Sequence, residues 1–116
     1  MKVEYVKKGN VLLVTPNESR LDAGVAQSFK SKMIEFFEEG HNDILIDLSK
    51  VTLIDSSGLG VLVSILKKVG EKGEVRLCGL RENIKSLFQL TRLDKVFDIY
   101  HSREEAVDSI NGHKSP

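Results

Sequence analysis

The apolar residues of this chain change their spacing in a regular order along the sequence. Two short strand-like runs, residues 3–5 and 11–14, flank Gly9-Asn10, a pair that favours a tight hairpin turn. Apolar runs with the length and β-branched content of strands recur at residues 44–48, 75–78 and 96–100. The sequence therefore predicts about five strands, the first two of which form an antiparallel hairpin.

Helical spacing of apolar residues begins after the hairpin. Phe29, Met33 and Phe36 recur three or four positions apart, which places them on one face of a helix. Asp22 is predicted to cap the start of this helix, because its carboxylate can accept a hydrogen bond from a first-turn amide. Gly40 follows the helix and is predicted to take the left-handed conformation that ends many helices.

Three more amphipathic helices are predicted along the rest of the chain. The second helix has apolar residues at Leu59, Leu62, Val63, Leu66 and Val69, with Val61 and Ile65 widening its apolar side. The third contains Leu80, Ile84, Leu87 and Phe88, and the fourth contains Ala106, Val107 and Ile110. Ser102 and Glu105 form a capping-box pair at the start of the fourth helix. The spacing leaves open whether Val61 and Ile65 are covered by neighbouring helices or face a partner.

The alternation of strands and helices predicts an α/β fold, because parallel strands need crossover connections. We expect a single domain in which a mixed β-sheet of about five strands is flanked by about four helices. Residues 1–110 are assigned to this domain. Residues 111–116 are polar and are predicted to form a flexible C-terminal tail.

The composition narrows the class of protein. Seventeen basic residues balance seventeen acidic ones, so no net charge draws the chain to nucleic acid or to an anionic membrane. The longest nearly apolar run, residues 59–66, is far shorter than the ~20 residues of a membrane span, and no signal peptide is evident. Cys78 is alone and is read as a buried strand residue, and no Cys/His cluster suggests a metal site. We therefore expect a soluble, cytoplasmic protein with no cofactor and no metal.

One segment gathers the candidate chemistry. Residues 47–49 (Asp-Leu-Ser) end a predicted buried strand, and residues 55–60 (Asp-Ser-Ser-Gly-Leu-Gly) open the second predicted helix. Sites in α/β proteins usually lie at the carboxyl ends of the strands, and a helix N-terminus favours an anionic oxygen. Gly58 and Gly60 leave room for the backbone of another molecule, or for a phosphate, to approach closely.

Two catalytic interpretations of this segment lack the residues they need. A nucleophile elbow requires Gly-x-Ser-x-Gly, but Ile54 stands two positions before Ser56, and Asp55 two before Ser57. The P-loop pattern and the dinucleotide-binding fingerprint are also absent from the sequence. Because no set of acid, base or metal ligands is assembled, we expect that the protein is not an enzyme.

Two interpretations of Ser56 stay open from the residues alone. If the helix begins at Ser57, Ser56 is its N-cap, and the hydroxyl projects at the positive end of the helix dipole. Phosphorylation there would add roughly −1.5 to −2 charges without unfolding the helix, and would block a partner docked over it. The other interpretation is that Asp-Ser-Ser-Gly is ordinary capping chemistry.

The same segment resembles the signature of the STAS domain family, specifically of the bacterial anti-sigma factor antagonists. Residues 47–62 read D-L-S-K-V-T-L-I-D-S-S-G-L-G-V-L and are similar to that signature nearly position for position. Shorter similar stretches are Leu21-Asp22-Ala23, Cys78-Gly79-Leu80 and residues 90–97, so the resemblance spans about residues 3–110. The chain departs from the family at Ser19-Arg20, where members often have Gly-Glu or Gly-Asp.

The resemblance implies a role in partner switching. In the family, the unphosphorylated antagonist binds an anti-sigma factor that is also a serine kinase, and this binding frees a sigma factor. The kinase phosphorylates the serine directly after the motif aspartate, which is Ser56 here, and a PP2C-type phosphatase restores binding. The expected partner-binding residues are Asp22, Asp55, Ser57, Gly58, Leu59 and Val61.

A second function is compatible with the same family. The chain could be a STAS accessory subunit of a lipid-transport ABC complex, which shares the fold and acts as a constitutive binding module. The intact Asp55-Ser56 pair favours the phosphorylated switch, since a purely structural subunit has no need of that site.

Overall fold

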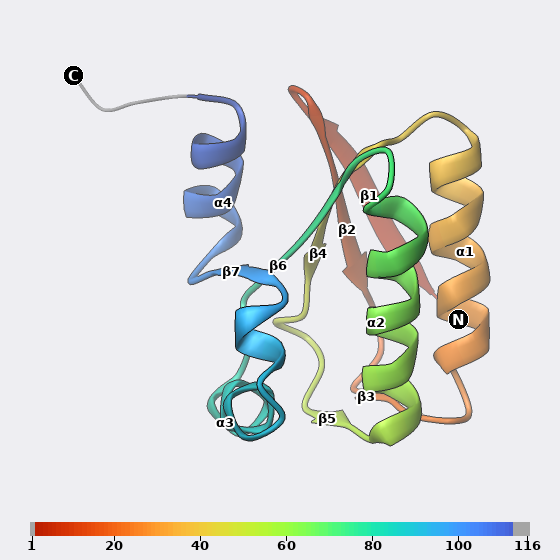
Figure 1. The fold of residues 1–116 in the computed structure, drawn as a ribbon, viewed down its shortest axis with the longest axis vertical. Coiled ribbons are helices and arrows are strands. Elements are labelled where there is room, and N and C mark those ends of the chain that lie inside the picture. Colours follow the sequence, from red (N-terminus) through yellow and green to blue (C-terminus); the bar gives the residue numbers. More distant parts are fainter. Residues whose placement is uncertain (1, 113–116) are drawn as a thin grey trace.

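A five-stranded sheet forms the centre of the molecule in the computed structural model, which describes residues 2–112 (Figure 1). The strand order is β1-β2-β4-β6-β7: β1 (Val3–Lys8), β2 (Val11–Pro16), β4 (Asp43–Asp47), β6 (Glu74–Cys78) and β7 (Asp98–Tyr100). β1 and β2 are antiparallel and all other neighbours are parallel, which confirms the predicted mixed sheet. A separate two-stranded sheet, which the sequence did not predict, pairs β3 (Arg20–Leu21) with β5 (Leu53–Ile54).

The predicted hairpin turn is confirmed between β1 and β2. Lys8 pairs with Val11, so Gly9-Asn10 is a two-residue loop, and Gly9 has a φ of +62°. A positive φ at the first loop residue is the type II′ pattern, which suits the twist of the flanking strands. The side chain of Asn111 fixes this turn, accepting a hydrogen bond from the Asn10 amide and donating one to the Lys8 carbonyl. The remaining tail residues 113–116 lie outside the described residues.

Helices cover both faces of the sheet, and all four lie in the predicted regions. They are α1 (Ala26–Glu38), α2 (Ser56–Val69), α3 (Glu82–Leu90) and α4 (Arg103–Ile110). Along β2, Leu12 and Val14 belong to the core shared with α1, α2 and α3, whereas Val11 and Leu13 pack with Ala106 of α4. Because neighbouring residues of a strand face opposite ways, α4 covers the face opposite to the other three helices (Figure 1).

Two helix ends agree with the sequence, and one start does not. Gly40 has a φ of +102° after α1, and the Ser102 hydroxyl caps α4 by accepting the Glu105 amide at 3.1 Å. The prediction that Asp22 is the N-cap of the first helix is wrong, because α1 begins at Ala26. The Asp22 carbonyl accepts the amides of Val25 and Ala26, so residues 22–25 make a separate turn before the helix.

The last strand is shorter than the apolar run predicts. It begins at Asp98, because Leu93–Lys95 forms a 3-10 helix, η1, and the chain enters the sheet only after Phe97. Phe97 is nevertheless buried and packs on Phe88, with 6.0 Å between the ring centroids. Phe97 is therefore apolar because it is buried in the core, although it is not part of the strand. Among the described residues, no helix is long and apolar enough to cross a membrane.

Candidate functional site

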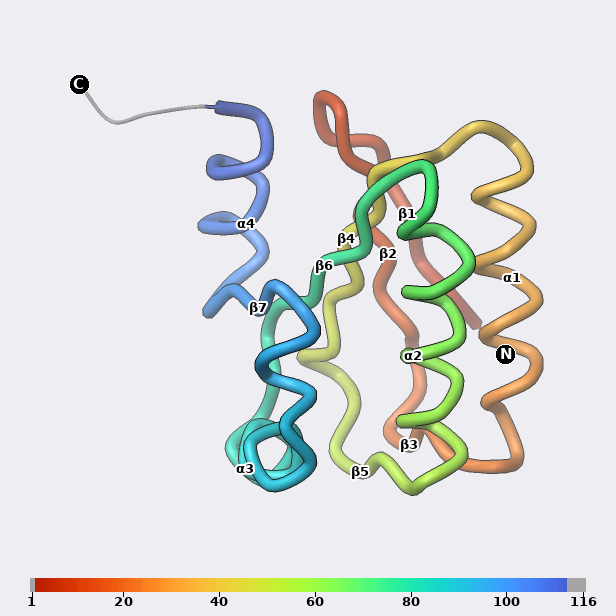
Figure 2. Tube along the Cα trace, in the orientation of Figure 1, coloured from red at the N-terminus to blue at the C-terminus, as the bar shows by residue number. Residues whose placement is uncertain are grey.

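The small β3–β5 sheet positions the start of α2 (Figure 2). Arg20 pairs with Leu53, and Leu21 pairs with Ile54, which brings two segments more than thirty residues apart side by side. The Ser19 carbonyl accepts the amides of Thr52 and Leu53 and the Thr52 hydroxyl. The chain then enters α2 directly after β5, so this pairing fixes where the helix begins.

Asp55, not Ser56, is the N-cap of α2. Its carboxylate accepts the Gly58 amide at 3.0 Å through Oδ1, and the Ala23 amide at 3.2 Å through Oδ2. Ser56 would be the cap of a helix beginning at Ser57, but α2 begins at Ser56, so Ser56 is its first residue and not its cap. Asp55 has extended backbone angles, which let its carboxylate accept the amide of Gly58, three residues further along the chain. This is the usual geometry of an aspartate N-cap.

The same carboxylate joins the two predicted parts of the site. Asp22 and Ala23 lie in the turn after β3, and Asp55 holds this turn against the helix through the Ala23 amide. Asp22 stabilises the turn itself, accepting the Gly24 amide at 3.0 Å. The structure thus brings Asp22, predicted from a distant segment, next to the start of α2.

Ser56 and Ser57 occupy the first turn of α2, and both are exposed. Their backbone amides have no partner within the helix, because the first intrahelical bond runs from Leu59 to the Asp55 carbonyl. The Ser56 hydroxyl makes no hydrogen bond to another residue of the described part of the chain. An exposed hydroxyl is therefore presented at the positive end of a 14-residue helix.

Gly58 is required by a contact within the chain. A β-carbon at Gly58 would lie 2.1 Å from the Leu21 carbonyl oxygen, so the close approach that the sequence suggested for another molecule is made by β3 itself. Gly60, in contrast, has open space around the position of a β-carbon. Of the two glycines, only Gly60 leaves room on the surface.

The buried side of α2 differs from the predicted stripe. Its centre is formed by Val61, Leu62, Ile65 and Val69, whereas Leu59, Val63 and Leu66 are only partly buried. Val61 and Ile65 are therefore covered by their neighbours, which decides the question that the spacing left open. Leu59 lies half-exposed one turn after the cap and borders the exposed serines.

Asp47, at the other end of the motif, lies at the end of β4 and takes no part in the start of α2. It is 3% exposed, its Oδ1 accepts the Ser49 amide at 2.9 Å, and its Oδ2 is held by the Arg103 guanidinium, with 2.8 Å to Nε. Arg103 also contacts the Thr15 hydroxyl at 3.3 Å. This pair ties α4 to the sheet, a role that the sequence could not reveal because the residues are 56 positions apart.

Cys78 neighbours this ion pair and is fully buried, as predicted. Burial, and secondly the Asp47 carboxylate, raise the pKa of its thiol to about 12. The thiol therefore stays protonated at neutral pH, which removes the nucleophilic thiolate form. No group of three or more His, Cys, Asp and Glu side chains that could hold a metal is found within residues 2–112.

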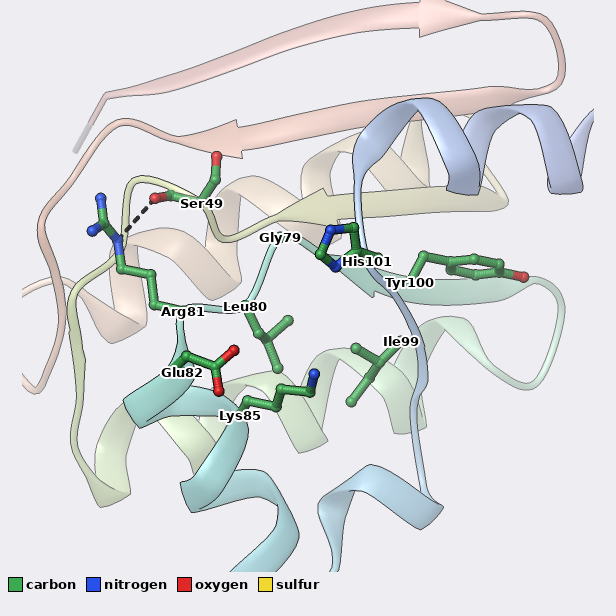
Figure 3. Close-up of a pocket in the computed structure, with 9 residues that line it drawn as sticks. All are labelled: Ser49, Gly79, Leu80, Arg81, Glu82, Lys85, Ile99, Tyr100 and His101. Atoms are coloured by element: carbon green, nitrogen blue, oxygen red, sulfur yellow. Dashed lines mark hydrogen bonds between the residues drawn. The ribbon is translucent and has the colours of Figure 1, made fainter.

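A hollow of about 310 Å³ opens at a different place, at the carboxyl ends of β6 and β7 (Figure 3). Its lining combines apolar Leu80 and Ile99 with the charged residues Arg81, Glu82 and Lys85. Arg81 is held by the Ser49 carbonyl, which accepts from its Nε at 3.0 Å. Neither Ser56 nor the turn after β3 lines this hollow, so the hollow is separate from the predicted site.

The fold and this helix start define the class of STAS-type α/β domains. The sequence matches the STAS domain family over residues 2–106, so the chain belongs to this family.

Relatives and solved structures agree with this assignment. A Thermotoga neapolitana protein, named as a candidate anti-sigma factor antagonist, is 36% identical over 105 residues, covering 89% of this chain and 92% of its own. The anti-sigma-B factor antagonist of Bacillus subtilis is 34% identical over 88 residues, covering 75% and 80% of the two chains. A Thermotoga maritima crystal structure, titled a candidate anti-sigma factor antagonist, has a TM-score of 0.86 at 33% identity and covers 93% of each chain.

The fold is also shared with SpoIIAA, which has been solved in unphosphorylated and phosphorylated forms. The two structures have TM-scores of 0.72 and 0.69 and are 18% and 19% identical to this chain. The first covers 96% of this chain and the second 94%, and each match extends over 97% of the SpoIIAA chain.

Proposed function

We propose that this protein is an anti-sigma factor antagonist controlled by phosphorylation of Ser56. In the unphosphorylated form it binds an anti-sigma factor that is also a serine kinase, and a sigma factor is set free. Phosphorylated Ser56 releases the kinase, and a PP2C-type phosphatase restores the binding form. The observation that carries the proposal is the exposed, unbonded Ser56 hydroxyl in the first turn of α2, directly after the capping Asp55.

The family membership and the relatives' names support the antagonist role. The Bacillus subtilis relative is named for action on an anti-sigma factor, and its match covers most of both chains. The structures of SpoIIAA in its unphosphorylated and phosphorylated forms support the idea that this fold tolerates the modification.

The phosphorylation step uses no catalytic group of this chain. The Ser56 oxygen forms a bond to the γ-phosphorus of ATP, the bond from that phosphorus to the β-phosphate oxygen breaks, and ADP leaves. The hydroxyl proton passes to a base of the kinase. Dephosphorylation adds water to the phosphoserine and releases inorganic phosphate. The protein is therefore a substrate of both enzymes and is not itself an enzyme in this proposal.

The local electrostatics explain why the modified protein stays folded. A phosphate on Ser56 lies beside the free amides of Ser56 and Ser57 and the positive end of the helix dipole. The first turn of α2 contains no acidic side chain, and the carboxylate of the preceding Asp55 is already bonded to the Gly58 and Ala23 amides. A partner seated on this surface would instead meet a bulky dianion in place of a small hydroxyl.

The proposed docking surface consists of exposed and half-exposed groups around Ser56. Ser57 and Leu59 provide it from α2, and Asp22 with the neighbouring exposed Ala23 provides it from the turn after β3. Asp55 joins the two parts. Gly58 and Val61, although included among the expected partner-binding residues, are buried, and we assign them the role of positioning α2 beneath this surface.

The test compares three variants against the cognate anti-sigma kinase. Ser56→Asp should abolish binding, whereas Ser56→Ala should bind normally but accept no phosphate from ATP. Ser109→Ala is the matched control, since it removes an exposed hydroxyl on α4, outside the proposed docking surface, and it should be phosphorylated as the natural protein is. Mass spectrometry of the protein from its own cells should find a phosphopeptide at Ser56.

The proposal fails if radioactive phosphate enters the Ser56→Ala protein as it enters the natural one. Another set of results would support the accessory-subunit function. The protein would co-purify with an ABC-type ATPase, Ser56→Asp would not affect this association, and Ser56 would stay unmodified in cells under several growth conditions.

A further inference from the structure

The free edge of β1 is a second candidate interaction surface, on the sheet edge away from β7. Among residues 2–112, β1 pairs only with β2, and it carries exposed apolar side chains at Tyr5, 57% exposed, and Val6, 46% exposed. Tyr5 packs on Phe36 of α1, with 4.8 Å between ring centroids, so this edge is held in place by the helix. An exposed strand edge is a template for pairing with another strand.

The backbone groups available at this edge can be identified from the hairpin. The Lys2 carbonyl accepts the Asn17 amide, and Lys8 pairs with Val11 across the turn. In an antiparallel ladder the direction of backbone groups alternates, so even-numbered residues of β1 bond to β2. The amide and carbonyl groups of Val3, Tyr5 and Lys7 consequently point away from the sheet.

The side chains of β1 are divided by charge between its two faces. Glu4, Val6 and Lys8 share one face, and Tyr5 and Lys7 share the other. Glu4 uses one carboxylate oxygen, Oε1, for Lys50 at 2.9 Å, which leaves Oε2 for another cation. Along the strand, this face therefore carries an acidic residue (Glu4), an apolar residue (Val6) and a basic residue (Lys8) in that order.

When a second β1 strand runs antiparallel to the first, the acidic end of this face lies opposite the basic end of its copy. If two β1 strands pair antiparallel with Val6 opposite Val6, then Glu4 of each copy faces Lys8 of the other, and Tyr5 faces Lys7. All these pairs join residues whose backbone groups point the same way, as an antiparallel ladder requires. The outward groups of Tyr5 and Lys7 then make about four hydrogen bonds between the copies.

Neighbouring registers place like charges opposite each other. Centring the pair on Tyr5 puts Lys2 opposite Lys8, centring it on Glu4 puts two glutamates together, and centring it on Lys7 puts two lysines together. Lysines on an edge normally discourage pairing with other strands. These three registers place like charges together, whereas the register centred on Val6 places Glu4 opposite Lys8.

We propose that β1 is a self-association surface, through which two copies of this chain pair antiparallel about a two-fold axis at Val6. The sheet would then continue from one copy into the other. Because the paired segment is short, we expect a reversible, concentration-dependent dimer. The proposal does not depend on Ser56 or on the anti-sigma factor.

Sedimentation equilibrium of the full chain from about 10 μM to about 1 mM provides the test. The natural protein should show a monomer–dimer equilibrium. Glu4→Lys and Lys8→Glu, measured separately, should each weaken association by about tenfold, because each places like charges opposite each other at both ends of the ladder. An equimolar mixture of these two variants should dimerise again, since lysines of one copy then face glutamates of the other.

Two controls separate the edge from general effects on the fold or the surface. Val6→Lys should abolish dimerisation, whereas Val96→Lys, at an exposed valine outside β1, should leave it unchanged. Lys50→Ala tests whether Glu4 acts through its existing ion pair, and it should not weaken the dimer. A natural protein that stays monomeric at 1 mM, a mixture that does not recover, or equal loss in Val96→Lys would each overturn the proposal.

Discussion

Asp47 and Asp55 belong to one sequence motif, eight positions apart, yet they act in opposite settings. Asp47 is buried and pairs with Arg103, so it joins α4 to the sheet. Asp55 is half-buried at the surface and accepts two backbone amides, so it fixes the start of α2 beside the turn after β3. One carboxylate stabilises the domain from within, and the other shapes the surface where Ser56 is presented.

A single sequence motif therefore combines a folding residue, Asp47, with a residue that shapes the functional surface, Asp55. Substitutions around Asp47 should act mainly on the free energy of unfolding. Substitutions around Asp55 should act on the local geometry of α2, with smaller costs in stability. Gly58 is the exception, since it lies in the surface segment but contacts the backbone of β3.

Gly58→Ala is expected to be the most damaging change. Its β-carbon would lie 2.1 Å from the Leu21 carbonyl oxygen, and neither backbone can move without breaking the β3–β5 pairing. We expect a loss of about 3 kcal/mol in the free energy of unfolding, measured by urea denaturation. Gly60→Ala is the matched control: its β-carbon meets open space, and it should stabilise the helix by up to about 1 kcal/mol. Equal effects of the two alanines would contradict this contact.

Asp47→Asn should cost about 2 kcal/mol, because it leaves the Arg103 guanidinium without its carboxylate partner. The loss of stability should be smaller than for a fully buried pair, because the Arg103 side chain is 40% exposed and water can solvate its charge. A double-mutant cycle with Arg103→Gln should show that the two effects do not add. Additive effects would mean that the pair contributes no coupling between α4 and the sheet.

Asp55→Ala should cost about 1 kcal/mol through the loss of the N-cap. The amides of Gly58 and Ala23 lose their acceptor together, so hydrogen exchange should accelerate at both positions, although they lie in different segments. Asp55→Asn should restore the cap at the Gly58 amide but not the bond from the Ala23 amide, because asparagine has only one acceptor oxygen. Faster exchange at Gly58 alone would show that the carboxylate does not hold the turn.

The sequence predicted the fold well because most of its signals are local. Strand-like runs, helical stripes, Gly9-Asn10 and the Ser102 cap each depend on residues close together in the chain. The hairpin turn and the cap are confirmed, and the strands and helices lie in the predicted regions, although the last strand is shorter and the buried side of α2 differs from the predicted stripe. The β3–β5 pairing was missed because each strand has only two residues, too few to give a periodicity. The helix start at Asp22 failed for a related reason: a capping residue predicts a turn as readily as a helix.

The candidate site was predicted only in part. The motif located Asp55 and Ser56, but the assignment of the cap depends on which carboxylate or hydroxyl reaches the Gly58 amide, and that is a matter of geometry. The Arg103–Asp47 pair has no sequence signal, because nothing local distinguishes an arginine that folds back onto a buried aspartate. The hydrophobicity of Val61 was equally compatible with a partner and with the core, and only packing decided between them.

Ser56→Ala should have the smallest effect on stability, within about 0.5 kcal/mol, because the side chain is exposed and its hydroxyl caps nothing. Ser56→Asp should keep or slightly raise the free energy of unfolding, by roughly 0.3–1 kcal/mol, since a negative charge is favourable at a helix N-terminus. Both values can be measured by thermal and urea unfolding at low and high salt, and the gain from aspartate should shrink as salt screens it. A marked loss of stability in Ser56→Asp would mean that release of the kinase could follow from unfolding of α2. Unchanged stability combined with lost binding would place the effect of the charge at the surface between the two proteins, where Asp55 holds Ser56 in position.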